Sequence, residues 1–176
     1  MKSIRDIISS LNETIELPKG SEVNGVAELV TKDDSTVPEI NGRYVGIDDI
    51  YPVRIYHRIL SMSSKLDAKG GYGNASGDVV NTYSLAMVVF LQYERAEKYP
   101  DELILKIQAN MPDIVKMPPY KNIKVTFTGA ALDSQSNWTQ EYKIGSNYRL
   151  KSDQFLFKIN YSIETTFSKG CFKECP

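Results

Sequence analysis

Residues that commonly carry catalysis or bind metals are scarce in this sequence, which has one histidine and two cysteines in 176 residues. A catalytic triad would have to be built on His57, and a zinc site needs about four ligands. His57 shares one face of a predicted strand with Val53, Ile55 and Ile59, so we interpret it as a structural histidine that is partly buried. Cys171 and Cys175 are predicted to be free thiols on a flexible tail, residues 169–176, although a disulfide is sterically possible. These residues predict no metal site.

Excess positive charge and long apolar runs are also missing. The net charge is −1 and the isoelectric point is near 5.9, so no global basic field favours nucleic acid, and no sequence-specific binding to it is expected. No run of eighteen apolar residues occurs, which argues against a membrane span. The N-terminal residues 1–6 lack the apolar core of a signal peptide, so synthesis in a cytoplasm is expected.

Phosphate and calcium motifs are incomplete. The glycine-rich stretch 69–78 ends in Ser76-Gly77-Asp78, without the lysine of a phosphate loop, and it leads into a predicted strand. The segment from Asp133 begins like a calcium loop but lacks the central glycine, and Ile144 stands where the glutamate should be. Adjacent acidic pairs are explained by turns and helix N-termini. The sequence therefore predicts a protein that is not an enzyme and that binds no cofactor.

The clearest pattern present is an alternation of apolar and polar residues from Phe155 to Phe167. Phe157, Ile159, Tyr161 and Ile163 lie on one face, whereas the intervening positions are mostly polar. A period of two predicts a β-strand with one buried face. The segment is about twice the usual strand length of roughly 5–6 residues. We expect it to form the spine of a sheet.

Two helices are predicted. Ser3 can cap the first, and apolar residues recur at helical spacing from Ile4 to Ile15. The second runs from Asp101 to Met111 and follows Pro100, which favours the first turn of a helix.

Further strands are predicted at 26–31, 37–40, 43–45, 53–60, 83–93 and 123–128, with Asn41-Gly42 as a tight hairpin turn. Residues 61–81 are expected to be either a flexible glycine-rich loop or a β-hairpin arm. The predicted fold is a single α+β domain, residues 1–176, with a mostly antiparallel β-sheet packed against an N-terminal helix and one internal helix.

The order of these elements resembles the small α+β subunits of bacteriophage necks and tails, in particular tail terminator (tail completion) and head-to-tail connector proteins. The resemblance is carried by the opening helix Ser3–Ile15, the strand and helix between Leu85 and Met111, and the ending Asp153–Ile163. It implies a structural virion protein that forms a homo-oligomeric ring, hexameric or alternatively dodecameric. It also implies contacts with tail tube, portal or connector proteins, and assembly in the cytoplasm of a bacterial host.

Two segments are candidate ring contacts. The polar face of the strand 53–60 could pair with acidic residues of a neighbour, and the stretch 65–78 could form an arm with an aromatic anchor. The candidate interface residues are Arg54, Tyr56, Arg58, Lys69, Tyr72 and Asn74. The alternative is a monomeric binding or adaptor module without catalysis. In that case the candidate stacking residues are Trp138, Tyr142 and Tyr148.

Overall fold

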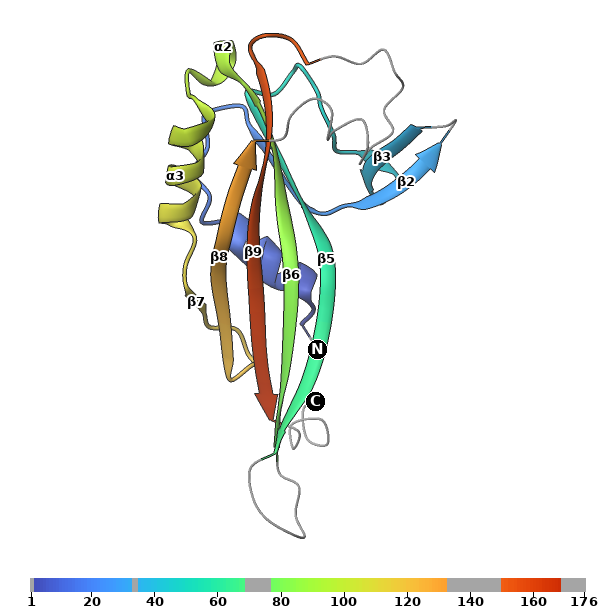
Figure 1. Ribbon diagram of the computed structural model, residues 1–176, viewed down its shortest axis with the longest axis vertical. Coiled ribbons are helices and arrows are strands. Elements are labelled where there is room, and N and C mark those ends of the chain that lie inside the picture. The colour runs from blue at the N-terminus through green and yellow to red at the C-terminus, as the bar shows by residue number, and fades with distance from the viewer. Residues whose placement is uncertain (1, 33–34, 69–76, 133–149, 169–176) are drawn as a thin grey trace.

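The computed structural model describes residues 2–32, 35–68, 77–132 and 150–168 (Figure 1). The predictions for Lys69, Tyr72, Asn74, the candidate stacking aromatics and the cysteine tail therefore lie outside the described residues. The elements, in chain order, are α1 (Ile4–Asn12), β1 (Glu22–Val26), β2 (Glu28–Lys32), β3 (Ser35–Ile40), β4 (Arg43–Tyr44), β5 (Val53–Ala68), β6 (Gly77–Gln92), α2 (Tyr93–Ala96), α3 (Pro100–Asn110), β7 (Ile114–Val115), β8 (Asn122–Leu132) and β9 (Gln154–Ser168).

A six-stranded sheet in the order β1-β5-β6-β9-β8-β7 dominates the domain, and β2, β3 and β4 form a separate three-stranded sheet. All neighbours in the large sheet are antiparallel except β1 and β5, which are parallel. The predicted fold class, a single α+β domain with a mostly antiparallel sheet, an N-terminal helix and an internal helix, is confirmed.

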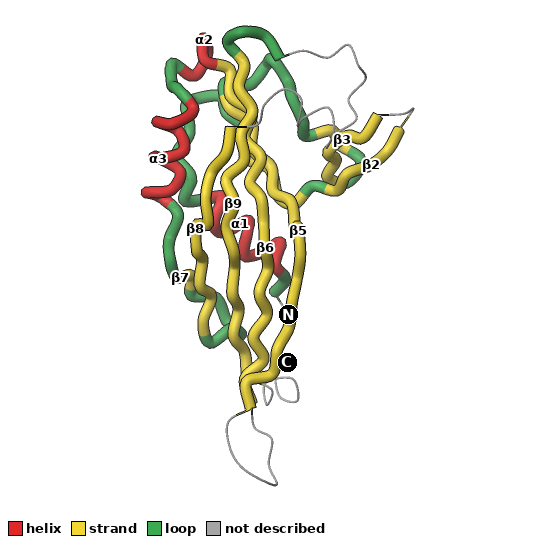
Figure 2. Tube along the Cα trace, in the orientation of Figure 1, coloured by secondary structure: helices red, strands yellow, loops and turns green. Residues whose placement is uncertain are grey.

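β5 and β6 form a hairpin much longer than the strands expected at 53–60 and 83–93. They pair from Val53 and Leu91 down to Ala68 and Gly77, with one irregularity between Ile59 and Ser61. Of the two alternatives for residues 61–81, the described part has strand pairing rather than a loop. Figure 2 shows this end of the hairpin reaching beyond the helices.

The long C-terminal strand is confirmed as β9, which pairs with β6 on one side and β8 on the other. Phe157, Ile159 and Ile163 are fully buried, as the alternation predicted. The other face is half-buried rather than exposed along most of its length. Leu156 is buried on that face, because the large sheet has a second, smaller core there.

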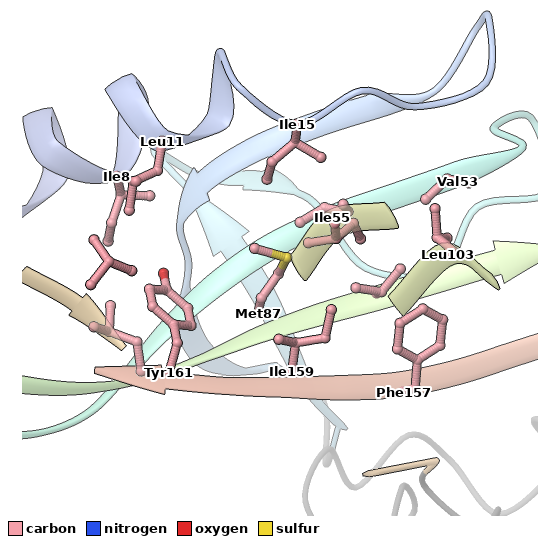
Figure 3. Close-up of a cluster of buried hydrophobic side chains, with 14 of the residues drawn as sticks. Ile8, Leu11, Ile15, Val53, Ile55, Met87, Leu103, Phe157, Ile159 and Tyr161 are labelled. Atoms are coloured by element: carbon pink, nitrogen blue, oxygen red, sulfur yellow. The ribbon is translucent and has the colours of Figure 1, made fainter. Parts of the chain in front are cut away.

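The main core lies between one face of the sheet and the helices. Ile7, Ile8 and Leu11 of α1 pack against it together with Leu103 and Ile107 of α3. Figure 3 shows Ile8, Leu11 and Leu103 converging with side chains of the central strands, including Met87 and Phe157. α1 begins as predicted, because the backbone N–H of Ser3 donates to the carboxylate of Asp6.

The second core lies on the opposite face, where Tyr56, Val88, Phe90 and Leu156 meet Ala27 and Val45. Because both faces of β6 are apolar and buried here, its prediction as a central strand covered on both sides is confirmed. The β3–β4 hairpin supplies part of this cover. Its two-residue turn has positive φ at Asn41 (51°) and Gly42 (78°), as the Asn-Gly pair predicted.

Several boundaries differ from expectation. The strand expected at 26–31 is divided between two sheets: β1 ends at Val26 and β2 begins at Glu28. The residue between them, Ala27, donates its backbone N–H to the carbonyl of His57. α3 begins at Pro100 and ends at Asn110, within a residue of its predicted limits. The short helix α2 was not predicted, because four residues are too few to show a helical period.

Candidate functional site

Charged and polar groups of β5 were the first candidates for contact with a neighbour, on the assumption that one face of the strand was solvated. That assumption is wrong for Arg54 and Tyr56, each of which is 3% exposed. Tyr56 packs within the second core. Arg58 lies two residues further along the same face of β5, is half-buried and has interactions within the chain. The β3–β4 hairpin and the loop after it cover the face that was expected to be wet.

Arg54 instead joins three segments of the chain. Its Nε donates to Oε2 of Glu22 (2.6 Å), its Nη1 to the carbonyl of Gly46 (2.9 Å) and its Nη2 to the carbonyl of Tyr44 (3.1 Å). The ring of Tyr51 lies 4.8 Å from the guanidinium carbon. Separating a buried charge from its partners would leave it uncompensated, which is strongly unfavourable. Arg54 therefore fixes β1 and the segment after β4 to the sheet.

The ionisation of Glu22 reflects the same cluster. Burial alone would raise the pKa of this carboxyl, but hydrogen bonds from Asn24 and Arg54 outweigh burial and hold the pKa below its usual range. Arg43 forms a second ion pair with Glu22 from the exposed side. The sequence offers no local sign of the cluster, because Glu22 lies 32 residues before Arg54.

A second polar chain crosses the main core. His57 is fully buried; its Nδ1 lies 2.7 Å from the hydroxyl of Tyr161, and its Nε2 lies 2.8 Å from Oδ1 of Asn12. Nδ2 of Asn12 donates to the carbonyl of Asn24. Since Oδ1 of Asn12 can only accept, Nε2 carries the proton and Nδ1 accepts from Tyr161. The chain joins α1, β1, β5 and β9.

Burial lowers the pKa of His57 to about 3 and raises the pKa of Tyr161. The imidazole is therefore neutral near pH 7, with both ring nitrogens engaged by side chains of the protein. His57 is buried as expected for a structural histidine, and its burial is more complete than predicted.

The described residues include no group of three or more His, Cys, Asp and Glu side chains arranged to hold a metal ion. None of the helices α1, α2 and α3, in the part of the chain that the structure covers, combines the length and apolar character needed to cross a bilayer. The surface feature that remains is an edge of the large sheet.

This feature, the β5 outer edge, comprises residues 59–66 on the side of β5 away from β6. β1 pairs with β5 only at Arg54, Ile55 and His57. Beyond that point β5 continues to Ala68 with β6 on one side and, among the described residues, no strand on the other.

The β5 outer edge also exposes large apolar side chains. Ile59, Leu60, Met62 and Leu66 are between 39% and 57% exposed. Proteins usually protect an exposed edge strand with charges, prolines or a cover, because its free backbone groups can pair with another chain. Here Lys65 is the only charged residue within the edge. A long edge with apolar side chains is typical of a strand that binds a partner.

The sequence also contains a signal for the continuation of β5 past residue 60, where the predicted strand 53–60 ended. Apolar residues at 60, 62 and 66 recur at even positions among polar ones, which is a period of two shifted by one residue from the preceding strand, at the irregularity between Ile59 and Ser61. Serine and lysine have weak strand propensity, so the stretch reads locally as a loop.

Comparison with known proteins identifies no relative: no protein-family model matches this chain, and no curated protein matches it significantly in sequence.

Proposed function

We propose that this chain is a structural subunit that assembles with copies of itself into a ring at the neck or tail end of a bacteriophage, as a tail terminator or head-to-tail joining protein. The ring, hexameric or alternatively dodecameric, would contact tail tube, portal or connector proteins. The proposal combines the resemblance in element order with the presence of an exposed edge suited to a strand from another chain.

The observation that carries the proposal is the β5 outer edge. No described strand pairs with its outer backbone groups, which can therefore form a line of hydrogen bonds with a strand of another chain, and Met62 and Leu66 (57% and 48% exposed) provide apolar area beside them. Strand addition to such an edge derives its affinity from main-chain hydrogen bonds and its specificity from side chains. Both contributions suit a permanent contact between protein subunits.

The buried polar groups do not support a catalytic alternative. Arg54 and His57 contact Glu22, Tyr161 and Asn12 in arrangements that join elements of the fold. A catalytic acid or base must reach a substrate. His57 is fully buried, and its ring nitrogens already have partners.

The mass of the full chain in solution, measured by light scattering after size exclusion, tests the proposal. We expect a discrete ring of six or twelve subunits. The double variant Met62→Lys/Leu66→Lys should shift the protein toward monomers while its far-UV circular dichroism stays unchanged, because charges on an edge oppose strand pairing.

Ile50→Lys is the matched control for this experiment. Ile50 is 70% exposed in the loop before β5, at the other end of that strand from residues 59–66, so its replacement should leave the assembly intact. A wild-type chain that remains a clean monomer over the whole concentration range would overturn the proposal and favour the monomeric adaptor module.

A further inference from the structure

We infer that copies of this chain join head to tail, with the β5 outer edge of one subunit pairing with the outer edge of β8 on the next. The inference rests on the proposed function, because it names the two surfaces that meet when the subunit assembles with itself. It commits to a second copy of the chain as the partner of the edge.

β8 has a free stretch of its own, here called the β8 outer edge, residues 126–132. β7 pairs with β8 only through Ile114 with Lys124 and Val115 with Ile123. From Thr126 to Leu132, the described residues include no strand on that side of β8. Leu132 is 59% exposed. Beyond the ends of the short strands β1 and β7, each edge of the large sheet therefore has a stretch with no described strand beside it.

The directions of the two strands suit this contact. β5, β6, β9 and β8 alternate in direction across the sheet, so β5 and β8 run in opposite directions. Two subunits placed side by side in the same orientation bring β8 of one against β5 of the next as an antiparallel pair. The joined sheet then keeps a regular antiparallel order. A contact between two different surfaces repeats from subunit to subunit and closes into a ring when the rotation permits.

The apolar side chains of the two edges share one face of the sheet. Directly paired residues on neighbouring strands point to the same side. Leu132 is paired with Phe157, and Met62 with Tyr83, and both partners contribute to the main core. In the joined sheet Leu132 of one subunit and Met62 of the next therefore lie on the same face, where they can cover each other.

The charges favour this pairing over the pairing of two β5 edges. Residues 126–132 contain no charged side chain, whereas residues 59–66 contain Lys65. Two antiparallel β5 edges would bring the lysines of both copies into one short ladder, and like charges in a ladder are unfavourable. The uncharged β8 outer edge introduces no such repulsion.

The free stretches lie at diagonally opposite ends of the sheet, which determines how the subunits are offset. Gly129 is in the same row as Arg58, through Asn160 and Ala86, whereas the β5 outer edge is centred further along the strand. Full overlap needs a shift of about four residues, or ~14 Å at ~3.4 Å per residue. A closed sheet of tilted strands requires a stagger of this kind.

Cysteine cross-linking between subunits tests the pairing. The background is the chain with Cys171→Ser and Cys175→Ser, and the introduced changes are Met62→Cys on β5 and Ala130→Cys on β8. Within one subunit β6 and β9 separate these positions by ~14 Å at the usual strand spacing of ~4.8 Å. A disulfide cannot span that distance. A short bis-maleimide reagent tolerates small differences in register and links only neighbouring subunits.

We expect the double variant to give a ladder of covalent multimers on denaturing gels. A mixture of the two single variants should give covalent dimers and nothing larger, and each single variant alone should give none. The variant with Ile50→Cys and Ala130→Cys is the control and should give no ladder, because residue 50 precedes β5 and lies far along the strand from residues 59–66.

The possible failures are distinct. Covalent dimers from Met62→Cys alone would show that two β5 edges meet, and would overturn the head-to-tail pairing. Assembly seen by light scattering without a ladder from the double variant would overturn this pairing and leave the ring intact. Monomers in light scattering together with no cross-links would overturn the proposed function as well.

Discussion

The stability of the domain should depend on pH between 5 and 7 mainly through His57. Burial lowers the pKa of this imidazole to about 3 in the folded chain. In the unfolded chain the pKa returns to about 6.5. Between these two values the unfolded state binds a proton that the folded state does not. The free energy of unfolding is therefore highest above pH ~6.5 and decreases as the pH falls toward 3.

The expected size of the effect follows from this difference. Each pH unit within the window changes the free energy of unfolding by about 1.4 kcal/mol. Allowing for partial titration near pH 6.5, the protein should be about 2 kcal/mol less stable at pH 5 than at pH 7. Asp6, Glu22 and Asp49 have pKa values below their usual range, so their contributions are lost mainly below pH ~5.

The assay is urea denaturation at pH 5, 6 and 7 and at one fixed protein concentration, since association changes apparent stability. His57→Gln is the test variant, and it should abolish most of the dependence between pH 5 and 7 whatever its effect on stability at pH 7. Because the chain has one histidine, no other imidazole can take its place. A slope in His57→Gln equal to that of the wild type would refute the reasoning.

Three further substitutions test the interior, and two of them have a matched control. Arg54→Ala should lower the free energy of unfolding by about 3–5 kcal/mol, because it leaves buried partners unpaired. The control Arg43→Ala, at the exposed ion pair, should lower it by about 0–1 kcal/mol. Urea denaturation measures both. Phe157→Asp should prevent folding, as circular dichroism would show; a soluble, fully assembled variant would contradict the assignment of the buried face. Gly46→Ala should lower the melting temperature, because a Cβ there overlaps the Tyr44 ring, while Gly25→Ala has open space and should not; equal effects would contradict the packing.

Local patterns account for much of the fold that could be predicted. The alternation in β9, the apolar spacing of α1 and the Asn41-Gly42 turn each depend on neighbours in sequence, so each was recognisable in advance. The candidate site was less accessible. Of the predicted interface residues that the structure describes, Arg54 and Tyr56 are buried, because a distant hairpin and loop cover a face that looks polar in sequence.

The sequence by itself determined the fold class, the long alternating strand, the two main helices and the structural character of His57, because burial patterns and turn preferences act over a few residues. Only the tertiary structure decided that β5 continues to Ala68, since pairing with β6 along its whole length compensates for weak local propensity. The tertiary structure also decided which parts of the sheet stay uncovered. Strand order and the short reach of β1 and β7 leave residues 59–66 and 126–132 without a described strand beside them, and no local pattern specifies strand order.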